Sequence, residues 1–195
     1  MNVPNDIELR GAFARLARRE MAALEGIFCQ WSEPLHNYAY ALTGSPDEAD
    51  DIVADTMARM ARLGWRLRLV RHPKAYLFAA IRNGVHSRAR RSQREAGLQA
   101  DPPRTEAGSE ESVVVREAVL RLPREQREVV VLRIWGGLTF EEIGRTVGVP
   151  LNTAASRYRH ALGKLREALE DDNDGSTQTR AAAEPDQTQL TKGHV

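Results

Sequence analysis

Apolar residues three and four positions apart recur along nearly every long segment of this 195-residue chain. That spacing places them on one face of an α-helix, whereas the alternation that is typical of strands is sparse. Proline, glycine and capping residues divide the chain into helices of ordinary length. We therefore predict an all-α fold.

The expected helices of the first half are bounded by such signals and cover residues 8–31, 34–42, 46–63 and 73–91. Pro34 and Pro73 open two of them, because proline suits the first helical position. Ser45 begins another, with Glu48 three positions later in a capping-box pattern. In the second half we expect helices from Val113 to Leu122, after Pro123 to Trp135, from Phe140 to Val147, and from beyond Pro150 to about Leu169.

Composition divides these helices between two modules. Residues 95–112 contain two prolines, two glycines, five acidic residues and one basic residue, a composition that predicts a flexible acidic linker. The predicted N-terminal module is 1–94 and the C-terminal module is 113–170, and each would need its own core. The polar segment 171–195 has no apolar period and is predicted to be disordered.

The net charge of +1 conceals a strong segregation of charge. Between Thr56 and Arg94 there are eleven basic residues and no acidic one. Clustered Lys and Arg favour a phosphate-binding surface, with a merely solvated face as the alternative. Acidic residues crowd the first half of the helix at 46–63, more than its dipole requires, and they indicate a basic partner: Asp47, Asp50, Asp51 and Asp55.

Residues 140–169 have the parts of a helix-turn-helix, which are a short helix, a tight turn with Gly148 and a longer amphipathic helix. Gly144 would let the two helices cross closely. The expected inward stripe of the longer helix is Ala154, Tyr158, Ala161, Leu162 and Leu165. The outward side chains suit base edges and phosphates, although an ordinary hairpin with a polar face is the alternative: Asn152, Thr153, Ser156, Arg159 and His160, with Arg157 at the margin.

Other function classes find no support in the sequence. Cys29 is the single cysteine and cannot form an intramolecular disulfide, the histidines lack metal-ligand spacing, and no glycine-rich phosphate loop is present. We therefore expect no enzyme activity, metal or cofactor. No signal peptide and no run able to span a bilayer is evident, which predicts a cytoplasmic protein without membrane insertion.

The chain resembles bacterial RNA polymerase sigma factors of the extracytoplasmic-function (ECF) type, in the sigma-70 family. Three segments carry this resemblance: ALTGSPDEADDIVADTMARMAR (41–62) and HPKAYLFAAIRNGVHSRARR (72–91) for sigma region 2, and LPREQREVVVLRIWGGLTFEEIGRTVGVPLNTAASRYRHALGKLR (122–166) for sigma region 4. It covers roughly 23–94 and 113–169. The two regions in this order across a linker are specific to the family.

The resemblance implies binding to core RNA polymerase, through the clamp helices and flap of its large subunits, and promoter-specific transcription initiation. An anti-sigma factor is a partner of many members. The implied core-binding residues are Asp50, Asp51, Ile52, Asp55 and Arg59. Those for the −10 promoter element are Arg66, Arg68, Arg71, Arg82, Asn83, Arg88, Arg90 and Arg91. Those for the −35 element are Asn152, Thr153, Ser156, Arg157, Arg159 and His160.

The chain departs from the family pattern at several of these places. Ala54 stands where Gln is frequent, Asn152 where Gly is common, and Ala155 where a basic residue is common. Tyr76 stands in place of a Trp, and we expect it to pack rather than stack on a base, whereas Trp65 could do either. The alternative reading is a free-standing helix-turn-helix regulator, which leaves the acidic helix and the basic block unexplained.

Overall fold

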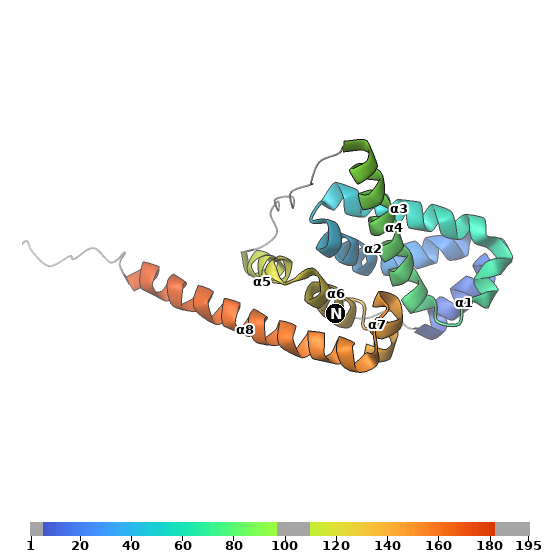
Figure 1. The fold of residues 1–195 in the computed structure, drawn as a ribbon. Coiled ribbons are helices and arrows are strands. Elements are labelled where there is room, and N and C mark those ends of the chain that lie inside the picture. Colours follow the sequence, from blue (N-terminus) through green and yellow to red (C-terminus); the bar gives the residue numbers. More distant parts are fainter. Residues whose placement is uncertain (1–5, 97–109, 182–195) are drawn as a thin grey trace, which may run out of the picture.

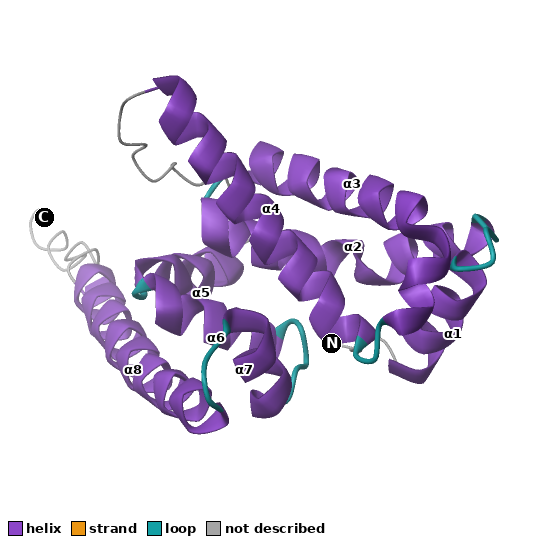
Figure 2. Ribbon diagram, turned by 45° about the vertical axis from the view of Figure 1, so that its right-hand side comes forward, coloured by secondary structure: helices purple, strands orange, loops and turns teal. Residues whose placement is uncertain are grey.

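The described part of the chain is built from helices and contains no strand (Figure 2). The structure is a computed structural model that describes the backbone of residues 6–96 and 110–181, and the side chains of 6–91 and 115–170. The predicted all-α fold is confirmed.

The N-terminal module is a bundle around one central helix (Figure 1). Its elements are α1 (Asp6–Leu16), α2 (Ala22–Thr43), α3 (Pro46–Leu63), the 3-10 helix η1 (Gly64–Leu69) and α4 (Pro73–Ala96). Helix α2 packs against α1, α3 and α4. The bounds of α3 match the prediction, and Ser45 caps it by accepting a hydrogen bond from the Glu48 N–H.

The predicted break at Pro34 is wrong, because α2 runs through this proline. An internal proline removes one helical hydrogen bond and costs about 3 kcal/mol. Apolar side chains on both sides of Pro34 are fully buried, among them Trp31 and Leu35. Their burial, worth about 2 kcal/mol per large side chain, holds the helix together across the proline.

The break lies instead between α1 and α2, inside the single helix predicted for residues 8–31. Arg19 has a positive φ of 69°, and Glu20 is paired with Arg15 at 3.0 Å and with Arg18 at 3.3 Å. No glycine or proline marks this turn in the sequence. Phe28, in the first half of α2, is about half exposed.

The C-terminal module consists of α5 (Glu110–Arg121), α6 (Arg124–Ile134), α7 (Phe140–Val147) and α8 (Leu151–Ala181). Helix α8 packs on α5, α6 and α7 and then projects beyond them (Figure 1). It is longer than the predicted end at about Leu169, so the tail is helical up to Ala181. No proline interrupts the sequence between Leu151 and Ala181. The disordered tail stays a prediction for 182–195, outside the described residues.

The two modules pack against each other instead of forming separate cores. Helix α2 packs on α6 and α4 packs on α7, and one cluster of buried side chains extends from Leu9 to Ala161. The expectation that each module has its own core is therefore wrong. Helices α2 and α4 each pack against helices of both modules. The predicted linker is bounded by α4 at Ala96 and by α5 at Glu110, and 97–109 lies outside the described residues.

Candidate nucleic-acid and polymerase interfaces

The α7–α8 pair forms the predicted helix-turn-helix. Thr139 and Glu142 make a complete capping box, in which each side chain accepts a hydrogen bond from the other residue's backbone N–H. Gly148 ends α7 in the left-handed conformation, with φ of 78°, which glycine adopts without strain. At Gly144 an added Cβ would lie 2.6 Å from the carbonyl oxygen of Val149. The predicted close crossing is therefore confirmed.

The inward and outward faces of α8 follow the prediction with one exception. Ala154 and Ala161 are fully buried, and Tyr158 and Leu165 pack against the core. Leu162 is 40% exposed and does not belong to the inward stripe. Its neighbour Ala161 and the later Leu165 face the core instead.

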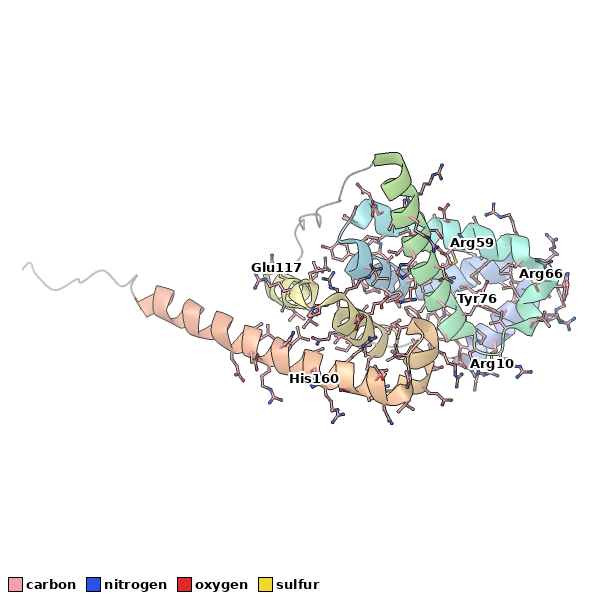
Figure 3. The ribbon with its side chains drawn as sticks, in the orientation of Figure 1. Arg10, Arg59, Arg66, Tyr76, Glu117 and His160 are labelled. Atoms are coloured by element: carbon pink, nitrogen blue, oxygen red, sulfur yellow. The ribbon has the colours of Figure 1, made fainter. Side chains whose placement is uncertain are left out.

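The residues assigned to the −35 element share the N-terminal half of α8. Asn152, Arg159 and His160 are exposed, whereas Thr153 and Ser156 are half-buried. Arg157 is half-buried and forms an ion pair with Glu125 of α6. Figure 3 shows His160 on α8, far from Arg66 at the other end of the molecule. A guanidinium, an imidazole and a carboxamide thus face solvent, while the guanidinium of Arg157 is held by its own module.

The acidic face of α3 carries most of the residues assigned to core polymerase. Asp50 Oδ1 lies 2.7 Å from His36 Nδ1, and Asp51 accepts a hydrogen bond of 2.6 Å from Arg88. Asp55 and Arg59 are exposed. Ile52 is buried at 2% exposure, so it packs inside the module and cannot be a surface contact. Its side chain faces α4, where a Cβ added at Gly84 would lie 3.0 Å from it.

The basic connector is the 3-10 helix η1 with the residues that follow it. Arg66, Arg68 and Arg71 are all exposed. Two apolar side chains are exposed beside them, Trp65 at 65% and Leu69 at 69%. An exposed indole between guanidinium groups has the composition of a platform for an unpaired base. The sequence left Trp65 open between packing and stacking, and its exposure excludes packing in the core.

The side chains of α4 that were assigned to the −10 element differ in exposure. Asn83, Arg90 and Arg91 are exposed, whereas Arg82 and Arg88 are half-buried. Arg82 Nε donates a hydrogen bond of 3.0 Å to Glu128, and Arg88 is bonded to an aspartate of α3. The helix that the sequence assigned to the −10 element therefore has two of its cations occupied by carboxylates.

Glu128 is the residue at this site that sequence reasoning missed. It is buried, and it also accepts a hydrogen bond of 3.4 Å from the Tyr38 hydroxyl. Burial and the adjacent carboxylate raise the pKa of Tyr38 well above its ordinary value, so the phenol stays protonated and donates. The available signal was a charged residue four positions before the buried Leu132, on the apolar face of α6.

Tyr76 packs, as predicted. Its ring meets that of Phe13 edge to face, with 6.0 Å between the ring centroids. Burial raises the pKa of its hydroxyl, although the nearby Arg59 charge opposes the shift.

The described residues contain no group of three or more His, Cys, Asp or Glu side chains placed to hold a metal ion. Among the helices of these residues, none combines the length and the apolar character that crossing a bilayer requires.

Comparison with known proteins identifies both modules. Residues 28–95 match the family described as Sigma-70 region 2, and residues 112–165 match Sigma-70, region 4. The chain is 30% identical over 142 residues to the ECF RNA polymerase sigma factor EcfG of Rhodopseudomonas palustris, covering 69% of this chain and 78% of the relative. It is 25% identical over 169 residues to the ECF RNA polymerase sigma factor SigL of Mycobacterium tuberculosis, covering 80% and 93%.

Two solved structures share the fold. One is the sigma factor RpoE in complex with the anti-sigma factor NepR from Bartonella quintana, with a TM-score of 0.62, 23% identity and coverage of 78% of this chain and 95% of that one. The other is CnrH in complex with the cytosolic domain of CnrY, with a TM-score of 0.63, 22% identity and coverage of 85% and 99%. With both regions in the family's order and a relative matched over most of its length, the chain belongs to the ECF RNA polymerase sigma factors, which direct transcription initiation.

Proposed function

We propose that this sigma factor divides promoter-specific initiation among three surfaces. The acidic face of α3 binds core RNA polymerase, η1 and α4 bind the −10 element, and α8 reads the −35 element. The observation that carries the proposal is that one chain combines two surfaces. The helix-turn-helix of α7 and α8 has an outward face of hydrogen-bonding and basic side chains, and the indole of Trp65 is exposed among arginines. This activity is binding, and it requires no catalytic group.

The −35 surface has the chemistry for reading a major groove. Asn152 can make a bidentate pair with adenine, and Arg159 can do so with guanine. His160, beside Arg159, can donate to a phosphate, which positions the helix without specifying sequence. Arg157 must exchange its Glu125 partner for a phosphate or base before it contributes.

The −10 surface has the chemistry for a displaced single strand. A base that leaves the stack can lie on Trp65, and stacking of this kind is worth about 1–3 kcal/mol per base. Arg66, Arg68 and Arg71 lie in the same connector and would neutralise successive phosphates. Asn83 and the arginines at the end of α4 would continue this track.

The polymerase surface consists of the exposed carboxylates of α3. Asp50, Asp51 and Asp55 would meet a basic surface on the clamp helices of the large subunit, and the C-terminal module would meet the flap. Both solved relatives are in complexes, one of them with an anti-sigma factor. We extend this to the chain as a proposal: an anti-sigma partner controls it in the cytoplasm, where core polymerase is found.

The first test is reconstitution. The chain should co-purify with core polymerase and support run-off transcription from a restricted set of promoters, which sequencing of transcript 5′ ends would identify. A chain that binds no core polymerase, yet alone protects a palindromic DNA site, would establish the free-standing regulator instead.

The second test separates the surfaces with single substitutions. Asp55→Lys and Arg159→Ala suit this test, because neither residue forms an ion pair within the described part of the chain, unlike Asp51 and Arg157. Asp55→Lys should lower core affinity about tenfold or more, since a like charge replaces an opposite one. Arg159→Ala should leave core affinity unchanged and weaken −35 binding by about 1–3 kcal/mol.

Matched controls are available on both modules. Glu25→Lys makes the same charge change on an exposed position of α2. Arg121→Ala removes an exposed arginine at the end of α5, together with a solvent-exposed ion pair to Glu117 that contributes little. Neither should change core affinity or −35 binding by more than about twofold. Equal losses of core affinity in Asp55→Lys and Arg159→Ala would refute the division of surfaces.

A further inference from the structure

The turn between α1 and α2 holds one arginine in a strained backbone conformation. Arg19 has a φ of 69°, in the left-handed region that glycine and asparagine enter at the lowest cost. Among the described residues, no other side-chain-bearing residue has a positive φ. The turn therefore keeps an arginine at a position where its backbone disfavours one.

The charges of this turn leave Arg19 without a partner of opposite sign. The carboxylate of Glu20 lies 3.0 Å from Arg15 Nε and 3.3 Å from Arg18 Nε, so it serves the two neighbouring arginines. The guanidinium of Arg19 forms no ion pair and no hydrogen bond within the part of the chain that the structure describes, and the residue is exposed. No charge contact of these residues offsets the strain at Arg19.

The side chain of Arg19 reaches the basic connector. Its guanidinium lies against Gly64, the first residue of η1, where an added Cβ would be 3.4 Å from Arg19 Nε and 3.6 Å from its Cζ and Nη2. Helix α1 packs along η1. Gly64 directly precedes the exposed Trp65, so Arg19 places a cation from a different helix beside the proposed base platform.

The surface that Arg19 joins is already basic. Arg66 and Arg68 of η1 are exposed, as is Arg71 after it. A further cation adds like-charge repulsion when no anion is bound. A single strand of nucleic acid reverses this effect, because its successive phosphates are neutralised by successive cations, which releases condensed counterions. The planar guanidinium also suits the paired oxygens of a phosphate.

We propose that Arg19 binds a phosphate of the single strand whose unstacked base lies on Trp65, on the side of η1 that faces α1. The proposal rests on the proposed function of η1 as part of the −10 surface, and it adds the α1–α2 turn to that surface. The residues that the family resemblance assigned to promoter DNA include none from α1, α2 or their turn. Strained backbone conformations are concentrated at functional sites, where the surrounding structure maintains them.

The salt dependence of DNA binding tests this contact. The probe is a fluorescein-labelled forked promoter DNA, single-stranded in the non-template strand from the −10 element onward, which is bound by core polymerase carrying the chain. Arg19→Gln removes the charge and keeps the length of the side chain. It should lower the affinity about threefold to fivefold at about 0.1 M KCl. It should also lower the slope of log affinity against log salt concentration by about 0.7, the value for one phosphate of a single strand.

Two further variants separate a direct contact from a general effect of charge. Arg19→Lys keeps the cation and should keep the slope within about 0.2 of that of the unchanged chain. Arg18→Gln makes the same charge change one residue earlier, where Glu20 already holds the guanidinium, and should lower the slope by less than about 0.3. An unchanged slope in Arg19→Gln, or equal losses in Arg18→Gln and Arg19→Gln, would overturn the proposal.

Stability distinguishes a role in binding from a role in folding. Arg19→Gly relaxes the left-handed backbone and should raise the midpoint of thermal unfolding by about 2–4 °C. The same variant should lose the slope that Arg19→Gln loses, so that binding weakens while the fold becomes more stable. A lower midpoint in Arg19→Gly would mean that the arginine stabilises the turn itself, and this result would also overturn the proposal.

The proposal and the sigma function fail in different ways. If core binding and run-off transcription succeed while Arg19→Gln keeps the full slope, the sigma function stands and the phosphate contact is refuted. If the chain binds no core polymerase, the same slopes are measured with the free chain and a fluorescein-labelled single-stranded DNA of random sequence. A loss of about 0.7 in Arg19→Gln then supports the phosphate contact although the sigma function has failed, and an unchanged slope refutes both.

Discussion

The two helices that we propose to read promoter DNA present their cations differently. On α4, Arg82 is held by the other module and Arg88 is held by α3. On α8, Arg159 is exposed, and Arg157 is paired only with its own module. The proposed −35 surface is therefore built by one module alone. The face of α4 that carries Arg82 lies against the other module.

The largest effect is expected at Gly144, where α7 lies very close to the turn that precedes α8. Gly144→Val places a side chain 2.6 Å from the Val149 carbonyl oxygen, and the backbone of the turn cannot retreat without losing the angle between α7 and α8. We expect a loss of about 3 kcal/mol in the unfolding free energy. Thermal unfolding and binding to a promoter duplex would measure it.

Gly163→Ala is the control for that substitution. A Cβ at Gly163 meets nothing within 4 Å, and alanine favours an exposed helical position by up to about 1 kcal/mol. It should therefore stabilise α8 and leave DNA binding unchanged. Equal destabilisation by both substitutions would mean that the crossing at Gly144 does not determine the stability of this module.

The next effect concerns the part of the −10 surface that stays exposed. Trp65→Ala should change the unfolding free energy by less than about 0.5 kcal/mol, because the indole is 65% exposed. It should lower the rate of open-complex formation by about tenfold or more, since stacking is worth about 1–3 kcal/mol per base. Leu69→Ala, on the same 3-10 helix, removes an equally exposed side chain that cannot stack. A similar loss in Leu69→Ala would show that Trp65 acts only through apolar area.

The helix-turn-helix and the contact between the modules also differ in how far the sequence predicted them. The helix-turn-helix was predicted to the residue for α7, because its signals are local: Thr139 and Glu142 lie three positions apart, and Gly144 and Gly148 act within one turn. The bounds of α3 follow equally local signals. Where neighbours in sequence decide the conformation, a pattern is sufficient.

The predictions that were wrong or missing concern places where residues distant in the sequence determine the conformation. Pro34 does not end its helix, because the stripe that includes Trp31 and Leu35 is buried against other helices. Arg19 makes a turn that no local signal marks. Glu128 pairs with Arg82 across 46 positions, and the spacing of α6 shows only that a charge lies on an apolar face. The shared core could not be predicted, since composition separates the modules without indicating that they pack together.

A smaller effect compares the caps of the two modules. Thr139→Ala breaks a reciprocal capping box and should cost about 1–2 kcal/mol, whereas Ser45→Ala removes a single bond and should cost about 0.5–1 kcal/mol. Urea unfolding at neutral pH would measure both. A larger loss in Ser45→Ala would contradict the assignment of the stronger cap to α7.

The cap of α7 also has a pH signature. Burial raises the pKa of Glu142, but hydrogen bonds from Thr139 and the charges of Lys74 and His72 together lower it more, so the pKa lies below its ordinary value of 4.5. A lowered carboxyl pKa contributes stability above pH 4.5 that is lost as pH falls through the folded pKa. Thr139→Ala should therefore flatten the acid limb of the stability curve. An unchanged limb would indicate that Glu142 is held by other groups.

The smallest effect concerns the contact between the modules, at His86. Burial, and then the charges of Arg124 and Arg82, lower its pKa from the ordinary 6.5, with Arg90 adding to the shift and Glu128 opposing it. The contact between α4 and α6 therefore favours the neutral ring of His86. This contact loses stability as pH falls below 6.5 toward the lowered pKa.

Spin labels on the exposed Cys29 of α2 and on a cysteine introduced on α8 by Glu167→Cys can measure this dependence as a distance between the modules. A longer population should grow when the pH falls from about 7.5 to about 5.5, because protonated His86 is repelled by Arg124 of α6 and Arg82 of α4. His86→Gln should abolish the response, whereas His160→Gln, on the exposed face of α8, should retain it. If the response persists in His86→Gln, the titrating group lies elsewhere, and the contact between α4 and α6 is held without regard to the charge of this ring.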